Sequence, residues 1–79
     1  MKNLCPLSEL PFGSSGRVIS LKTHGNTRAR MFDLGLVNGT IVSSVLKSPL
    51  GDPTAYSVRG ALIALRQKDA DNIFVKPFY

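Results

Sequence analysis

The chain has 79 residues, ten Lys and Arg against five Asp and Glu, and a single cysteine. Because single domains usually run to about 100–150 residues, this length excludes a two-domain enzyme, and we expect one domain over residues 1–79. The hydrophobic fraction of 43% is that of a folded chain, and a single cysteine excludes an internal disulfide.

The net charge of +5 has two interpretations. A cationic surface can bind nucleic acid, acidic protein or anionic membrane, but a charge of about 2–8 is also ordinary for a small soluble domain. The basic residues are scattered from Lys2 to Lys76 and never adjacent, which favours the second interpretation. The chain start lacks the apolar stretch of a leader peptide, and no segment approaches the roughly 20 apolar residues that span a bilayer, so we expect a cytoplasmic protein.

Frequent glycine and proline residues divide the chain into short apolar segments, as is typical of a small all-β barrel or sandwich. One helix fits, at Asn26–Leu34, where Asn26 or Thr27 can cap the free N–H groups and Gly35 can end the helix. A second helical turn is predicted at Gln67–Asn72. Strands rich in β-branched residues are predicted at Arg17–Lys22, Ile41–Lys47, Ala55–Arg59, Ala61–Arg66 and near Ile73–Lys76.

Hydrophobic periodicity assigns faces to these elements. Met31 and Leu34 share one side of the helix, which we expect to pack on the core. Tyr56 and Val58 alternate with polar neighbours, so one face of their strand is expected to be wet. The run from Leu62 to Leu65 is apolar on both faces, which predicts a strand central to the barrel.

Few groups in the chain could carry catalysis or bind a metal. His24 precedes Gly25 and is interpreted as a polar turn residue, while Cys5 has no cationic neighbour beyond Lys2 to stabilise a thiolate. The chain has no closely spaced Cys or His residues, so no zinc site is predicted. We expect neither enzymatic activity nor a cofactor. A weak, oxygen-rich site for a divalent cation could use Asp33, Asp52, Asp69 or Asp71. The favoured interpretation is that these carboxylates are solvated.

The loop Ser48–Pro53 places Leu50 between two prolines. In one interpretation the loop is a rigid apolar tip that inserts into a partner's groove and loses little entropy on binding. In the other, Leu50 folds back and caps the barrel. The sequence favours neither.

Arginine and aromatic side chains could also combine into a surface for single-stranded nucleic acid. The aromatic fraction of 8% and the absence of tryptophan weigh against this function. The residues concerned are Arg28, Arg30, Arg59, Arg66, Phe32, Tyr56 and Phe78–Tyr79.

Six short segments carry motifs that are specific in combination: Leu7–Leu10, Gly13–Val18, Gly25–Leu36, Gly39–Thr40, Ser48–Pro53 and Val58–Gly60. Together they resemble the FeoA family over about Leu7 to Val75, nearly the whole chain. The resemblance implies a mainly β fold, a small SH3-like barrel of about five strands with one or two short helices. It also implies a cytosolic, non-enzymatic accessory protein of bacterial ferrous iron uptake, whose partner is the FeoB membrane transporter.

We therefore predict a surface that docks on the cytosolic face of an FeoB-type transporter. A small interface gains affinity from an apolar anchor rimmed by charge, and the helix, the loop and the neighbouring strand offer both. We expect no metal ligand among the contacts. The predicted partner-binding residues are Arg28, Arg30, Met31, Phe32, Leu50, Asp52, Tyr56 and Arg59.

Other functions stay open. A small-barrel nucleic-acid-binding protein would use the positive charge directly, and its affinity would fall steeply with salt. An iron carrier or sensor would bind the ion itself, although the chain has few soft or imidazole ligands. The same SH3-like module also occurs in metal-dependent repressors of the diphtheria-toxin-repressor type, a role that would require a partner chain because this sequence has no helix-turn-helix pattern.

Overall fold

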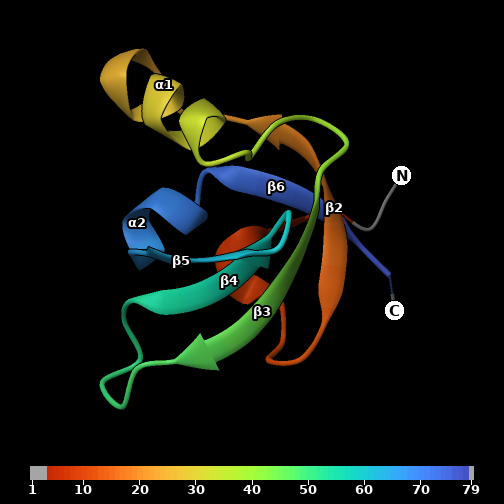
Figure 1. Ribbon diagram of the computed structural model, residues 1–79, viewed down its shortest axis with the longest axis vertical. Coiled ribbons are helices and arrows are strands. Elements are labelled where there is room, and N and C mark those ends of the chain that lie inside the picture. Colours follow the sequence, from red (N-terminus) through yellow and green to blue (C-terminus); the bar gives the residue numbers. More distant parts are fainter. Residues whose placement is uncertain (1–3, 79) are drawn as a thin grey trace.

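The fold is one antiparallel sheet of six strands that curves around a core, with short helices at its margins (Figure 1). The computed structural model describes residues 4–78. The strands are β1 (Cys5–Pro6), β2 (Ser15–Leu21), β3 (Ile41–Lys47), β4 (Thr54–Val58), β5 (Ala61–Leu65) and β6 (Ile73–Pro77). The helices are the 3₁₀-helix η1 (Leu7–Glu9), α1 (Gly25–Asp33) and α2 (Gln67–Ala70).

The strand order is β1-β6-β2-β3-β4-β5, and every neighbouring pair is antiparallel. Register shifts between Val18 and Ser20 in β2 and between Ser44 and Leu46 in β3 bend the sheet, because a bulge adds local twist. The mainly β class is confirmed. The pairings among residues 4–78 do not join β1 to β5, so the sheet is open at both ends and the predicted barrel is not closed by strand pairing.

The sixth strand is the one that the sequence did not predict. β1 has two residues and pairs Cys5 with Val75 and Pro6 with Phe74. Two residues are too few to show the alternation by which a strand is recognised. No helix within the described residues is long and apolar enough to cross a membrane.

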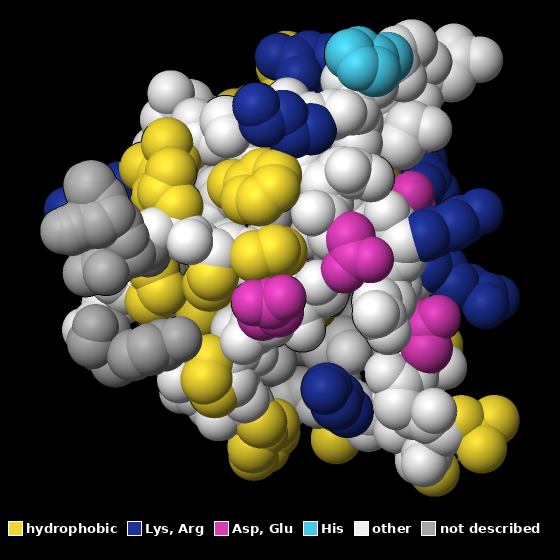
Figure 2. All heavy atoms as spheres, turned by 180° about the vertical axis from the view of Figure 1, so that it is seen from behind, with side chains coloured by type: hydrophobic (Ala, Val, Ile, Leu, Met, Phe, Trp, Pro, Cys, Tyr) yellow, Lys and Arg dark blue, Asp and Glu magenta, His cyan; other side chains and the backbone are white. Residues whose placement is uncertain are grey.

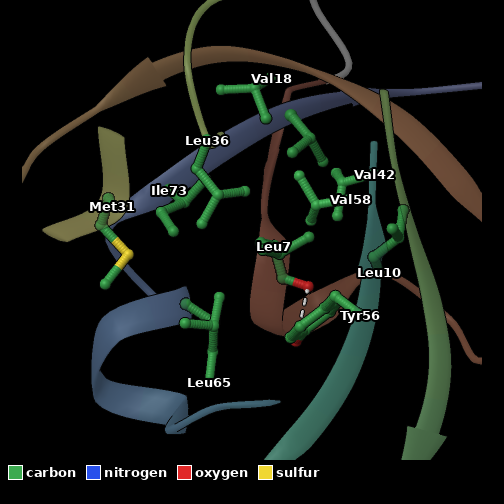
Figure 3. Close-up of a cluster of buried hydrophobic side chains, with 12 residues drawn as sticks. Leu7, Leu10, Val18, Met31, Leu36, Val42, Tyr56, Val58, Leu65 and Ile73 are labelled. Atoms are coloured by element: carbon green, nitrogen blue, oxygen red, sulfur yellow. Dashed lines mark hydrogen bonds between the residues drawn. The ribbon is translucent and has the colours of Figure 1, made fainter. Parts of the chain in front are cut away.

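The core gathers one face of the sheet and one side chain or more from each helix (Figure 3). Met31 from α1 is fully buried and Leu34 packs against the cluster, which confirms the predicted apolar face of that helix. The buried hydrophobic residues are Leu7, Leu10, Val18, Met31, Leu36, Val42, Tyr56, Val58, Leu65, Ala70, Ile73 and Val75.

The prediction that Leu62–Leu65 forms a central strand is wrong, because β5 lies at the edge of the sheet. The turn at Arg59 and Gly60 returns the chain along β4, and the next strand, β6, pairs with β2 instead of β5. In addition, only one face of β5 packs on the core. Leu65 is 3% exposed, whereas Leu62 is 65% exposed.

Both helices were predicted within a residue or two of their ends. α1 ends where Gly35 takes a φ of +92°, a conformation that glycine adopts without strain. A capping side chain from Asn26 or Thr27 is not found, because the helix begins at Gly25 and its N-cap is His24, which makes no side-chain cap hydrogen bond. α2 is shorter than the predicted Gln67–Asn72.

The different burial of the two faces of β5 can be tested. Leu65→Ala should lower the free energy of unfolding by about 2–5 kcal/mol, as is usual when a buried leucine is truncated. Leu62→Ala, the matched control three residues earlier, should cost less than about 1 kcal/mol because it removes exposed surface. Urea denaturation measures both. Equal costs would mean that β5 is buried on both faces.

Candidate functional site

Two of the eight predicted contact residues cannot reach a partner. Met31 is fully buried and Tyr56 is 2% exposed, so both belong to the core and their prediction as contacts is wrong. Both follow the periodicity that turns their side chains inward, Met31 on the apolar side of α1 and Tyr56 on the inner face of β4. Their partners are core residues: the Tyr56 hydroxyl donates a hydrogen bond to the Leu7 carbonyl oxygen at 3.5 Å (Figure 3).

Arg28 and Phe32 form a separate pair on the outer side of α1. The Arg28 guanidinium carbon lies 4.9 Å from the centre of the Phe32 ring, a cation–π contact one helical turn apart. Arg28 also donates to the Leu21 carbonyl oxygen at 3.2 Å. α1 lies at the top of Figure 1 and the tip of the β3–β4 loop at the bottom, and neither Arg28 nor Phe32 lines the hollow that Asp52 of that loop borders.

Arg59 is also apart from the loop. It occupies the β4–β5 turn with a φ of +53° and lines a shallow hollow with the segment 37–41. Its side chain lies against Gly35, where an added Cβ would come within 2.9 Å of the Arg59 Cδ. Arg59 therefore packs at the end of α1.

Of the remaining three predicted residues, Arg30 and Asp52 line one hollow together with α2. Leu50 lies two residues before Asp52 in the β3–β4 loop. The hollow, of about 520 Å³, is lined by Arg30 from α1, Asp52 from the β3–β4 loop, and side chains of and next to α2. We call this surface the charged edge; it comprises Arg30, Asp52, Arg66, Lys68 and Asp69. Figure 2 shows basic and acidic side chains gathered along this edge, with hydrophobic side chains below them.

Two contacts fix the charged edge. Arg30 Nη2 lies 3.1 Å from Asp69 Oδ2, which ties α1 to α2. Asp52 Oδ1 accepts a hydrogen bond from the Gln67 backbone N–H at 2.8 Å, which satisfies a free donor at the start of α2. The Asp52 carboxylate thus caps the N-terminus of α2, a role usually filled by the residue just before a helix.

Hydrogen bonds within the β3–β4 loop hold its conformation. Ser48 Oγ donates to the Asp52 carbonyl oxygen at 2.9 Å, and the Gly51 N–H donates to the Ser48 carbonyl oxygen at 2.8 Å. Leu50 at the tip is 93% exposed, so the interpretation in which it folds back as a cap is wrong. An apolar side chain held out on an ordered turn loses little entropy on binding.

The charged edge is positive overall, with three cations against two carboxylates. Among residues 4–78 the Arg30–Asp69 contact is the one ion pair, which leaves Arg66 and Lys68 without a carboxylate in range. The sequence did not predict that Asp69 pairs with Arg30 or that Lys68 lines the same hollow, since both are nearly forty positions from Arg30. Nothing in the local pattern around Lys68 points to Arg30.

No metal site is found in the part of the chain that the structure describes. Groups of three or more His, Cys, Asp or Glu side chains that could hold an ion are absent from it. Three of the four acidic residues considered above are engaged separately: Asp69 with Arg30, Asp52 with Gln67, and Asp71 with the hydroxyl of Ser8. The fourth, Asp33, is exposed at the end of α1. The loop tip thus carries an exposed leucine, and Asp52 of the same loop borders a hollow with Arg66 and Lys68.

Comparison with known proteins gives a family for the chain. A family model described as FeoA domain matches residues 5–77. A curated protein of Porphyromonas gingivalis, named Fe(2+) transport protein A/Fe(2+) transporter FeoB fusion protein, is 33% identical over 70 residues, which are 89% of this chain. The chain spans only 8% of the length of that relative.

Solved structures agree with this match. The FeoA protein of Chlorobium tepidum has a TM-score of 0.88 and 35% identity, over 94% of this chain and 70% of that one. FeoA of Stenotrophomonas maltophilia, solved with zinc and described as a prokaryotic SH3 domain protein, has a TM-score of 0.76 and 37% identity over 87% and 86% of the two chains. A manganese-dependent transcriptional repressor has a TM-score of 0.87 over 99% of this chain and 44% of that one, but its 13% identity shows a shared fold alone.

The burial of Tyr56 can be tested by its ionisation. Burial raises the pKa of the Tyr56 hydroxyl above its ordinary value of about 10. The folded state thus disfavours the phenolate, so this contribution to stability is complete below pH 10 and is lost as the pH rises through the raised pKa. In a Tyr79→Phe background, where Tyr56 is the only tyrosine left, phenolate absorbance should appear above pH 10 and together with unfolding. Titration at pH 10 in a chain that stays folded would contradict the burial.

Proposed function

Because the FeoA domain model matches residues 5–77, the chain belongs to the FeoA family, and we propose that it is a non-catalytic accessory protein of ferrous iron uptake. In this proposal it acts at the cytosolic face of a membrane and docks on the cytosolic part of an FeoB-type transporter.

The observation that carries this proposal is the fusion protein of Porphyromonas gingivalis, whose name joins Fe(2+) transport protein A and the transporter FeoB in one polypeptide. Linking two modules raises their effective concentration to the millimolar range, so even a weak contact between them is populated. A relative 33% identical to this chain is held beside a transporter in that way. The same pair of surfaces would need moderate affinity when the two proteins are separate chains.

The charged edge suits such a contact. Leu50 supplies an apolar anchor that is already ordered, and interface energy concentrates in a few anchors of this kind. Arg66 and Lys68 border the same hollow as Asp52 of that loop, and such a cationic rim steers association with an acidic surface more than it adds affinity. The Arg30–Asp69 pair fixes the position of that rim against α1.

Replacing Leu50 tests the anchor. Leu50→Asp should weaken binding to the purified cytosolic domain of the FeoB-type transporter from the same organism at least tenfold, because a charge cannot enter an apolar groove. The matched control is Leu62→Asp, the same change at an exposed leucine on β5, which should leave affinity within twofold. Calorimetry measures affinity, and circular dichroism checks that both variants fold.

Three outcomes would count against the proposal in different ways. Equal losses from the two variants would mean that added negative charge, not the loop tip, weakens binding. Unchanged affinity of Leu50→Asp would remove the loop from the interface. No binding by the unaltered chain would contradict the docking function itself.

A further inference from the structure

The connection from α1 to β3 contains a tight turn with an Asn-Gly pair at its centre. The Thr40 N–H donates to the Val37 carbonyl oxygen at 3.0 Å, and Gly39 has a φ of +97°, a positive value that glycine readily adopts at the third position of a turn. Asn38 and Gly39 are both exposed and line a hollow of about 640 Å³, so water reaches them. The docking function proposed above makes no use of this pair.

An asparagine followed by a glycine can lose its side-chain amide without an enzyme. The Gly39 nitrogen forms a bond to the side-chain carbonyl carbon of Asn38 and gives up its proton. The bond from that carbon to the side-chain nitrogen breaks, and ammonia leaves with the proton. Water then adds to either carbonyl of the resulting succinimide ring, which leaves aspartate or isoaspartate at position 38. Glycine has no Cβ to obstruct the attack.

The other asparagines among residues 4–78 are less suited to this reaction. Asn26 is followed by a threonine and Asn72 by an isoleucine, and these β-branched side chains crowd the attacking nitrogen. Asn72 also donates its Nδ2–H to the Lys68 carbonyl oxygen at 3.1 Å, which orients its amide within its own helical turn. Within this part of the chain, covalent chemistry therefore favours Asn38.

The folded turn occupies the nitrogen that would attack. The Gly39 N–H donates to the Val18 carbonyl oxygen in β2 at 2.7 Å, and Arg17 Nη1 donates to the Gly39 carbonyl oxygen at 3.0 Å. Both backbone polar groups of Gly39 are thus held against β2. A backbone nitrogen held in this way becomes free when the turn opens locally, which is also the event that exposes an amide to hydrogen exchange.

We propose that Asn38 is a deamidation site that the folded chain suppresses through the two contacts of Gly39 with β2. Conversion of Asn38 then records how often the turn opens. Either product adds a carboxylate to the hollow that Arg59 also lines, and lowers the net charge of +5 by one unit. Isoaspartate also adds a side-chain carbon to the backbone path, so this product cannot remake the hydrogen bonds of the turn.

Peptide mass spectrometry of the chain aged in mildly alkaline buffer tests the site. In concentrated guanidinium chloride, Asn38 should convert at least tenfold faster than Asn26 and Asn72, because a glycine follows it. In the folded chain, its conversion should slow by at least the factor that protects the Gly39 amide from hydrogen exchange in the same buffer. Asn38→Gln is the control for the assignment and should stay unconverted at this position.

The contact from Arg17 gives a second test. Arg17→Met removes the hydrogen bond to the Gly39 carbonyl oxygen, so the folded chain should convert Asn38 at least threefold faster and the protection of the Gly39 amide should fall. The rate in guanidinium chloride should not change. The matched control is Arg59→Met, which removes a cation that lines the same hollow and should leave the folded rate within twofold. Circular dichroism checks that both variants are folded during ageing.

Four results would overturn the proposal. Faster conversion of Asn26 or Asn72 in denaturant would remove Asn38 as the reactive site. Equal rates for Asn38 in the folded and unfolded chain would mean that the turn does not suppress the reaction. No acceleration by Arg17→Met would remove its contact from the mechanism, and equal acceleration by Arg59→Met would assign the effect to charge. Because no transporter is present, these outcomes do not depend on the docking function.

Discussion

The constraint on which this structure depends is a sheet too short to close around its own core. β1 and β5 remain unpaired with each other, so strands alone do not enclose the apolar side chains. Each of the three short helices supplies a fully buried residue in their place: Leu7 from η1, Met31 from α1 and Ala70 from α2. Burial of a Leu or Met side chain contributes about 1.5–3 kcal/mol to the free energy of unfolding. A domain of this size has little stability to spare, so it depends on these residues.

The same constraint builds the charged edge. A helix of four residues is not stable alone, so α2 must be held from outside. It is held by the Asp52 carboxylate on the Gln67 N–H and by Asp69 on Arg30 of α1. These contacts bring the β3–β4 loop, α2 and α1 to one border. The surface proposed for docking is thus a by-product of the contacts that close the core.

Local pattern was enough to predict α1, its glycine stop and five of the six strands to within one or two residues of their ends. It failed where the outcome depends on pairing. The run Leu62–Leu65 has the composition of a central strand, but β6 pairs with β2 and leaves β5 at the edge, with Leu62 on an uncovered face. The prediction of the contact residues was partly wrong for the same reason. Met31 was chosen as a contact despite its inward face, and Lys68 was missed because its relation to Arg30 exists only in three dimensions.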